Sequence, residues 1–393
     1  MIVRAQDRVQ GSGIRDLIWF ASAALFSFLL AGCRTHDFPQ YPANYREYAY
    51  VTNGASDTVT VLDVVDVRVE RELAVGRHPV AVAASPTRNE VYVVNSGAAD
   101  AIGSISVIDA EHNTVVTTIS LERQPVSIDV APDGNLAYVA NAGANSVSVV
   151  DLKARRERAQ IGVGEEPVAA RLAPDGKSLV VANRRGNSVT VIDTASRRVR
   201  AVIEGCPGAA GVAILADSSK AFVPCSAGHQ VMAIALARAG QPDRLETLMD
   251  VGRAPVDLAL KPDGGEIFAC NSLSNSVSEI YNSTNEVGDT YMIGANPVRG
   301  LVSRDNSLLY VADLSSQEVT VYSIDDGKLA GAIHVGDGPT ALAFSAAGHL
   351  LFVADSRSGD VAVVRTATQS LFTMLPAGRD PNAIVDKAFK VEK

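Results

Sequence analysis

Tyr50-Val51-Thr52-Asn53 is a short β-patterned run that ends in an amide, and similar runs recur along the chain. Seven further copies begin at Tyr92, Tyr138, Val180, Phe222, Phe268, Tyr310 and Phe352. The steps between successive copies are 42, 46, 42, 42, 46, 42 and 42 residues. A period in this range, filled with short strand-like runs, predicts a β-propeller in which each repeat forms one blade.

Each repeat has the pattern of four short strands joined by tight turns. In the second repeat the strands are predicted at residues 79–85, 91–95, 105–109 and 115–120. Other repeats carry Pro-Asp-Gly in the first turn, where proline presets φ and glycine accepts a positive φ. We label the strands a to d from the propeller axis outward, and the proline-led strand is a.

The two ends of the chain complete each other. The first repeat has strands b, c and d but no strand a, whereas residues 380–385 read as a lone strand a. Seven complete sets of four strands lie between them. We therefore predict an all-β propeller of eight four-stranded blades, closed by pairing of the N- and C-terminal strands in one blade, which leaves no open edge. The alternative is seven blades with one degenerate repeat.

Charge narrows the possible partners. The 393-residue chain has a formal net charge of −9, and a leader ending before Cys33 would itself carry three arginines and two aspartates, so its removal leaves −10. This acidic balance argues against nucleic acid as a partner, because binding to phosphate backbones needs a basic surface. We expect one propeller domain over residues 49–389, a C-terminal tail at 390–393, and a monomer.

The N-terminus has the pattern of an export signal. Arg15 precedes an apolar run at residues 17–30, which is shorter than the roughly 20 residues that a spanning helix needs. Leu30-Ala31-Gly32-Cys33 then resembles the bacterial lipobox, where a peptidase cuts before a lipidated cysteine. We predict a signal peptide at 1–32, lipidation of Cys33 and a tether at 33–48, hence an extracytoplasmic, membrane-anchored lipoprotein in the periplasm or at the cell surface. An uncleaved anchor and an ordinary signal peptide are the alternatives.

The repeats resemble those of the YVTN-repeat β-propeller family, whose motif residues 50–53 spell literally. The family includes surface-layer proteins and YncE-like periplasmic proteins, and the resemblance covers residues 50–389. It implies the fold, but its members share no single activity. A looser similarity extends to lactonases and to eight-bladed haem d1 domains, although no motif here carries either chemistry.

Searches for catalytic and metal-binding motifs give no candidates. The sequence contains no Cys-x-x-Cys-His, His-Glu-x-x-His, phosphate loop or Gly-x-Ser-x-Gly, and its six histidines do not cluster. We therefore predict no catalytic residue, no metal site and no cofactor. The Asn or Asp that ends strand b in seven of the eight repeats is expected to cap its own b–c turn.

The cysteines suggest a disulfide. If Cys33 is lipidated, Cys206, Cys225 and Cys270 remain in an oxidising compartment. Strand a of the fifth repeat starts near Cys206 and strand b ends at Cys225, so antiparallel pairing places both at one end of the blade. We predict a bond between them that staples an irregular blade, and a buried thiol at Cys270.

The repeats differ mainly in the loops from strand d to a and from b to c, which share one face around the axis. These loops are polar and mixed in sign, so we predict a binding face for an unidentified protein or a small anionic ligand. Its candidate residues are Arg77, His78, Arg123, Glu165, Glu166, Arg184, Arg185, Arg253, Asn296, Asp337, Arg379 and Asp380. The alternative is a solvated loop face without a ligand.

Asp257 and Arg299 hold the same strand-a position in adjacent repeats. They are expected to form an inter-blade ion pair or, alternatively, to contact a polar ligand in the axial channel. Taken together, the patterns favour a lipid-anchored, non-enzymatic binding or assembly platform. The alternatives are a periplasmic enzyme, either lactonase-like or a cofactor-bearing oxidoreductase with its site at the axis, and a YncE-like nucleic-acid binder.

Overall fold

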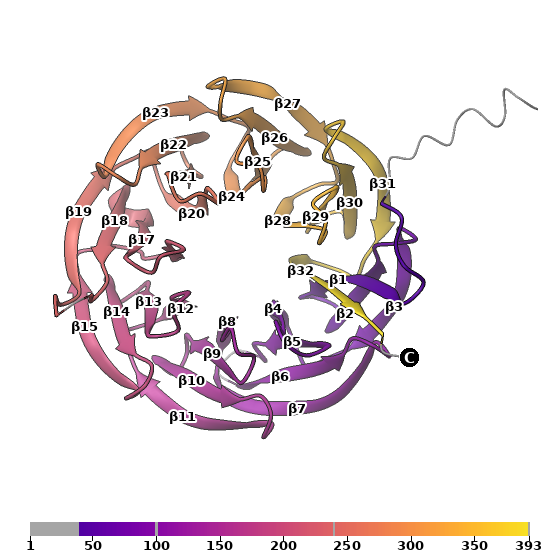
Figure 1. Cartoon of the computed structure of the whole chain (residues 1–393), viewed down its shortest axis with the longest axis horizontal. Coiled ribbons are helices and arrows are strands. Elements are labelled where there is room, and N and C mark those ends of the chain that lie inside the picture. The colour runs from indigo at the N-terminus through magenta and orange to yellow at the C-terminus, as the bar shows by residue number, and fades with distance from the viewer. Residues whose placement is uncertain (1–38, 99–100, 239, 392–393) are drawn as a thin grey trace, which may run out of the picture. The chain divides into compact units, whose positions relative to one another are not determined.

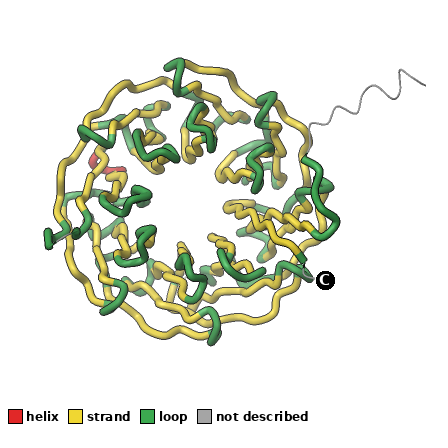
Figure 2. Tube along the Cα trace, viewed as in Figure 1, coloured by secondary structure: helices red, strands yellow, loops and turns green. Residues whose placement is uncertain are grey.

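The computed structural model describes residues 39–98, 101–238 and 240–391. The predicted signal peptide and Cys33 lie outside these residues. Asn44–Lys393 forms one compact unit built from eight four-stranded antiparallel sheets. The sheets are arranged around a ring (Figure 1), and nearly all of the described chain is strand or tight turn (Figure 2). The chain is therefore an eight-bladed β-propeller, as the strand count predicts.

The strand bounds follow the repeat. Strands a, nearest the axis, are β32 (Pro381–Lys390), β4 (Pro79–Ala84), β8 (Pro125–Val130), β12 (Pro167–Leu172), β16 (Ala213–Ile214), β20 (Pro255–Leu260), β24 (Pro297–Val302) and β28 (Pro339–Phe344). Strands b are β1 (Tyr45–Asn53), β5 (Glu90–Asn95), β9 (Leu136–Asn141), β13 (Ser178–Asn183), β17 (Lys220–Cys225), β21 (Glu266–Asn271), β25 (Leu308–Asp313) and β29 (Leu350–Asp355). In this order they belong to blades 1 to 8.

The outer strands are given in the same blade order. Strands c are β2 (Thr58–Asp63), β6 (Ile102–Asp109), β10 (Ser146–Asp151), β14 (Ser188–Asp193), β18 (Gln230–Ala235), β22 (Ser276–Tyr281), β26 (Glu318–Ser323) and β30 (Asp360–Arg365). Strands d are β3 (Arg68–Ala74), β7 (Thr114–Arg123), β11 (Arg156–Gly162), β15 (Arg198–Glu204), β19 (Arg244–Asp250), β23 (Glu286–Met292), β27 (Lys328–His334) and β31 (Ser370–Pro376). A single 3₁₀ turn, Ser226–Gly228, follows β17.

The ends of the chain close blade 1. Strand β32 pairs antiparallel with β1, with Tyr50 opposite Val385 and Tyr45 opposite Lys390. Figure 1 shows this yellow C-terminal strand inside the indigo N-terminal strands. The predicted closure is confirmed, and strand b begins at Tyr45, five residues before the repeat motif starts.

The core lies between neighbouring blades. Tyr92 and Val107 of blade 2 pack in one cluster with Val139 and Val150 of blade 3, and all four are nearly inaccessible to solvent. Side chains on both faces of strands b and c are buried in this way. Alternating burial is therefore confined to strands d, whose outward residues are exposed.

The asparagines that end strand b cross-link two strands. Asn141 is fully buried, and its Nδ2 donates to Ser148 Oγ at 2.8 Å and to Ser146 Oγ at 3.3 Å on strand c. Asn183 makes the equivalent bonds to Ser188 and Thr190. The structure thus differs from the expected capping of the turn backbone. The repeated asparagines are scaffold residues because their amides are enclosed within the blade.

The loops from strand d to strand a share one backbone conformation. The residue just before strand a has a left-handed backbone, as at Glu166 (φ 52°) and Asn296 (φ 61°). Its N–H is held by a side chain from the preceding b–c loop: Asn145 Oδ1 accepts from Glu166 N at 2.9 Å. In blade 5, His229 Nδ1 takes this role and accepts from Ala254 N at 3.1 Å. His229 is therefore a scaffold residue, and its role explains its place in a b–c loop.

Candidate functional site

We call the face that carries the d–a and b–c loops the top face, and the face with the a–b and c–d turns the bottom face. The residue two positions before strand a is equivalent in all blades of the top face. From blade 1 to blade 8 it is Arg379, Arg77, Arg123, Glu165, Pro207, Arg253, Ala295 and Asp337; in blade 5 the count is made from Ala209, which pairs with Cys225 as the strand-a prolines pair with the last residue of strand b. The repeat thus places three arginines on the consecutive blades 1, 2 and 3.

These arginines have no acidic partner within the described part of the chain. Arg77, Arg123, Arg253 and Arg379 are all exposed, and no described carboxylate lies within ion-pair distance of their guanidinium groups. Arg379 Nη2 donates to the carbonyl of Ala55 at 2.8 Å, which orients its side chain but leaves its charge uncompensated. The four side chains are therefore available to an anionic group from another molecule.

Most of the other charged residues predicted on this face form ion pairs with one another. Arg184 Nη1 lies 3.6 Å from Glu166 Oε1, and Arg185 Nε lies 3.8 Å from Glu166 Oε2. Arg357 Nη1 lies 3.5 Å from Asp337 Oδ1. Arginine and acid thus pair with each other on blades 4 and 8, whereas the arginines of blades 1 to 3 and of blade 6 have no ion-pair partner among the described residues; Asp57 and Asp380 stand in the same loops of blade 1 but beyond ion-pair distance.

His78, Asn296 and Asp380 belong to the loop scaffold. His78 N donates to Asp57 Oδ1 at 2.8 Å, and its Nδ1 lies 3.1 Å from the carbonyl of Gly54. The N–H of Asn296 is held by an asparagine of the preceding loop, and the carbonyl of Asp380 accepts from Gly54 N at 2.8 Å. His78 and Asp380 follow Arg77 and Arg379 directly, and all three scaffold residues have the left-handed backbone that recurs just before strand a.

An extension of strands β6 and β7 at the top face was not predicted from the sequence. The repeat of blade 2 is 46 residues long, and the extra residues lengthen its b–c loop. Residues 99–100 of this loop are not among those that the structure describes. Strands β6 and β7 are longer than the c and d strands of other blades, and Ile102 pairs with Arg123 at their top ends, away from the turn that joins them. Ile102 is 70% exposed. The length of the repeat indicates an insertion in blade 2. The sequence alone does not show that Ile102, the apolar residue of this insertion, is exposed.

Two Asp–Arg pairs link strands a of adjacent blades. Arg299 Nη1 lies 2.9 Å from Asp257 Oδ1, while Gly300 N donates to Asp257 Oδ2 at 3.0 Å. Asp129 repeats this arrangement: its Oδ2 accepts from Leu172 N at 2.7 Å, and Arg171 Nη1 lies 3.9 Å from its Oδ1. Burial raises the pKa of Asp129 despite this arginine. The second pair was not predicted, although both residues stand four positions after their strand-a prolines.

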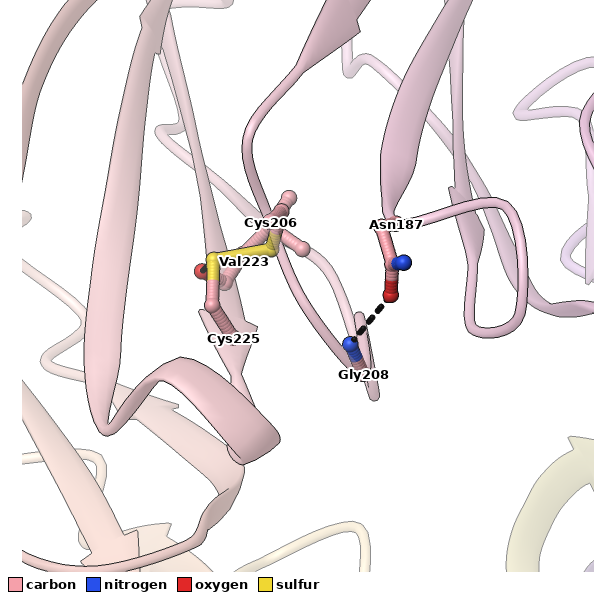
Figure 3. Close-up of a disulfide and its surroundings, with 5 residues drawn as sticks. All are labelled: Asn187, Cys206, Gly208, Val223 and Cys225. Carbon is pink, nitrogen blue, oxygen red and sulfur yellow. Dashed lines mark hydrogen bonds between the residues drawn. A yellow bond between two sulfur atoms is a disulfide. The ribbon is translucent and has the colours of Figure 1, made fainter.

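Cys206 and Cys225 meet at the top of blade 5 (Figure 3). Their Cα atoms are 4.7 Å apart, and the two sulfur atoms are placed at bonding distance. The loop that contains Cys206 is held from blade 4, because Gly208 N donates to Asn187 Oδ1 at 3.2 Å (Figure 3). Strand β16 of this blade has only two residues, so the two cysteines join the parts of an irregular blade. The third described cysteine, Cys270, is buried, and burial raises the pKa of its thiol.

Two inter-blade grooves of the bottom face are repeats of one structural feature. A groove of 280 Å³ between blades 7 and 8 contains Tyr310 and Phe344, and one of 370 Å³ between blades 3 and 4 contains Tyr138 and Leu172 at the matching positions. Grooves that recur at matching positions reflect how blades stack. A cleft of 520 Å³ on blades 3 and 4 is different, since Glu165 and Arg185 line it.

The described residues contain neither a metal-binding cluster nor a membrane-spanning helix. No group of three or more His, Cys, Asp or Glu side chains there is arranged to hold a metal ion. No helix among them is long and apolar enough to cross a membrane.

Comparison with known proteins agrees with the propeller architecture. A family model described as "Lactonase, 7-bladed beta-propeller" matches residues 10–199, just under half of the chain. No curated protein matches the sequence. Solved propellers are nonetheless similar in structure. Hydrazine synthase of Kuenenia stuttgartiensis is 22% identical with a TM-score of 0.57, covering 81% of this chain and 92% of its own.

Two other solved structures carry names of enzymes. The dihydro-haem d1 dehydrogenase NirN, in complex with DHE, is 15% identical with a TM-score of 0.71, covering 88% of this chain and 76% of its own. A putative 6-phosphogluconolactonase from Bacteroides fragilis is 16% identical with a TM-score of 0.59, covering 77% and 98%. At such identities the similarity extends to the fold alone. The class of protein is thus a β-propeller, here with eight blades.

Proposed function

We propose that this protein is a binding or assembly platform that engages its partner through the top face. The observation that carries this proposal is the contrast between the blades and their loops. The buried amides, hydroxyls and left-handed loop residues recur from blade to blade, whereas the residue two positions before strand a changes its charge. Variation on a fixed scaffold is the usual arrangement of recognition loops.

Replacement of the four unpaired arginines tests this proposal. Arg77, Arg123, Arg253 and Arg379 are exposed loop or strand-end residues, so changing all four to alanine leaves the fold intact. The variant should lose a protein that cross-links to the parent in native membranes. Recovery of the same cross-linked proteins by the folded variant would reject the top face as the binding surface.

The lipid anchor is the second part of the proposal. It is supported by the lipobox-like Leu30-Ala31-Gly32-Cys33 after a short apolar run. A Cys33→Ala variant should lose fatty-acid labelling and leave the membrane fraction, while the propeller stays folded. A parent protein without lipid, or with a mature N-terminus elsewhere, would contradict the anchor but would leave the loop-face proposal standing.

A lactone hydrolase is the second candidate function. The family match over residues 10–199 suggests it, and the cleft with Glu165 and Arg185 offers an exposed carboxylate to activate water beside a cation for a developing negative charge. Release of acid from glucono-δ-lactone, followed with a pH indicator, tests this function. Activity that disappears in Glu165→Gln supports the hydrolase, and the absence of activity in the parent rejects it. A third candidate, a cofactor-bearing oxidoreductase, predicts visible absorption in protein purified from its native membrane.

A further inference from the structure

The uncompensated arginines of the top face form a continuous series. Arg379, Arg77 and Arg123 occupy the equivalent position on blades 1, 2 and 3, which follow one another around the ring. We propose that this series, with Ile102 beside it, binds an extended acidic segment of a partner protein that also carries an apolar side chain. This inference rests on the proposed function and names the partner's chemistry.

The scaffold fixes where each arginine stands. Arg379 N donates to Ser56 Oγ at 2.6 Å, so its backbone is tied to the b–c loop of blade 1. Arg77 precedes His78, whose N–H is held by Asp57, and Arg123 ends strand β7, where it pairs with Ile102. A partner therefore meets guanidinium groups on anchored backbones, which lowers the entropy lost on binding.

Charge favours an acidic occupant. The planar guanidinium group of arginine can donate two hydrogen bonds at once to a carboxylate. The series contains three such groups, one on each of three blades. An extended partner segment with spaced carboxylates can contact all three guanidinium groups, whereas a single small anion can contact only one or two. The formal net charge of the chain is −9, so this positive region stands out from the rest of the molecule.

A series of aspartates lies on the opposite face. Aspartates occupy the a–b turns of successive blades, where their carboxylates accept the N–H two residues later, as with Asp133 and Asn135. The other members of this series are Asp175, Asp217, Asp263 and Asp305. Two of these aspartates are paired with cations, Asp217 with Arg238 at 3.3 Å and Asp263 with Lys261 at 3.5 Å, so the bottom face is mixed in charge and, among the described residues, lacks a comparable series of unpaired arginines on consecutive blades.

The apolar part of the proposed segment is matched by Ile102. This side chain is 70% exposed at the top end of strand β6, directly opposite Arg123 in the pairing with β7. An extended chain places alternate side chains on opposite sides, so carboxylates can face the arginines while an apolar side chain covers Ile102. Burying an exposed isoleucine adds an attraction that salt does not screen.

Binding of a defined peptide to the mature full chain in detergent tests the inference. The probe is a short fluorescein-labelled peptide that repeats Glu-Leu-Glu-Ser, measured by fluorescence anisotropy at low salt. The control peptide repeats Gln-Leu-Gln-Ser. We expect saturable binding of the acidic peptide and at least roughly tenfold weaker binding by Arg77→Ala/Arg123→Ala/Arg379→Ala, because three exposed ion pairs are lost.

Two further variants test whether the loss of binding is specific to the arginine series and Ile102. Ile102→Ser should weaken binding about threefold, as expected for losing part of an apolar contact. Arg156→Ala/Arg158→Ala, which removes two exposed arginines from the outer strand β11, should leave affinity unchanged because these side chains lie off the top face. Thermal unfolding of each variant shows that any loss is not a loss of fold.

Several outcomes would overturn the inference. They are no saturable binding of the acidic peptide, equal binding of the glutamine peptide, and equal affinity in the triple arginine variant. Competition by inorganic phosphate at concentrations that match the peptide, or preference for phosphatidylglycerol vesicles, would assign the arginines to another ligand. If the quadruple alanine variant still loses its cross-linked partner while the peptide fails, only the acidic-segment inference is rejected.

Discussion

Asp313 Oδ2 lies 2.5 Å from Thr320 Oγ1, in the place where Asn183 of blade 4 donates to Thr190. Blades 7 and 8 thus carry acids, Asp313 and Asp355, where the other blades carry an amide or, in blade 5, a cysteine. Both acids are fully buried. Burial raises the pKa of Asp313 to about 7 and that of Asp355 to about 8. The folded protein therefore holds protons at these sites in mildly acidic solution.

The Asp313→Asn variant tests the consequence for stability. Because its folded-state pKa lies above the unfolded value of 3.8, the contribution of Asp313 to stability is complete below that value and is lost as the pH rises to about 7. The parent should lose as much as roughly 1.4 kcal/mol per pH unit from this group, and the variant should lose less. Urea denaturation between pH about 5 and about 8 measures the difference. Asp66→Asn, at an exposed side chain, is the control, and equal slopes in parent and Asp313→Asn would contradict the prediction.

Strand β32 should be essential to the fold. A chain that stops after Gly378 lacks the inner strand of blade 1 and exposes Tyr48 and Tyr50, so its free energy of unfolding should fall by several kcal/mol at about 25 cal/mol per Å² of apolar surface. A chain that stops after Val391 keeps the strand and serves as the control. Equal midpoints of denaturation for the two truncated chains would argue against closure by this strand.

The cysteines of blade 5 should be joined in protein from the oxidising compartment. Intact mass before and after reduction and alkylation should show one bond, between Cys206 and Cys225, and one thiol at Cys270 that reacts only after unfolding. A Cys206→Ser/Cys225→Ser variant should lose roughly 3 kcal/mol, as expected for opening a loop between cysteines 19 residues apart. Three alkylated thiols in unreduced protein would show that the bond does not form.

Replacing the two residues of the Asp257–Arg299 pair should have unequal effects on stability. Asp257→Ala removes the partner of both Arg299 and the buried N–H of Gly300, so it should cost about 1–3 kcal/mol in free energy of unfolding. Arg299→Ala removes only a half-exposed ion-pair partner and should cost about 1 kcal/mol or less. Chemical denaturation of the two variants at neutral pH compares them. A larger loss for Arg299→Ala would mean that the guanidinium supports the channel by other contacts.

The sequence was sufficient for the architecture because a propeller repeats its hydrophobic and turn patterns with a fixed period. Counting strands from Tyr50 to the lone strand at residues 380–385 predicted the closure. The position of the arginines also followed, since equivalent residues of a repeat fall on one face. Which charges compensate each other did not follow, because Arg184 reaches Glu166 through side-chain conformations that the repeat does not determine.

Departures from the repeat were harder to interpret. Ile102 lies in an insertion, so no equivalent residue in another blade indicates its exposure. Asp313 matches an asparagine in most blades, and only its burial shows that it holds a proton near neutral pH. Both cases depend on solvent access, which a single sequence pattern does not report.

The most direct test of the top-face account is photo-cross-linking in cells from matched alanine positions. Ala55 and Ala98 are exposed in the b–c loops of blades 1 and 2, and Ala154 and Ala195 are exposed in c–d turns of the bottom face. With a photoreactive residue at each position in turn, we predict a defined protein adduct from positions 55 and 98 and none from 154 and 195. Adducts that form only from 154 and 195, or equally from all four, would contradict the account.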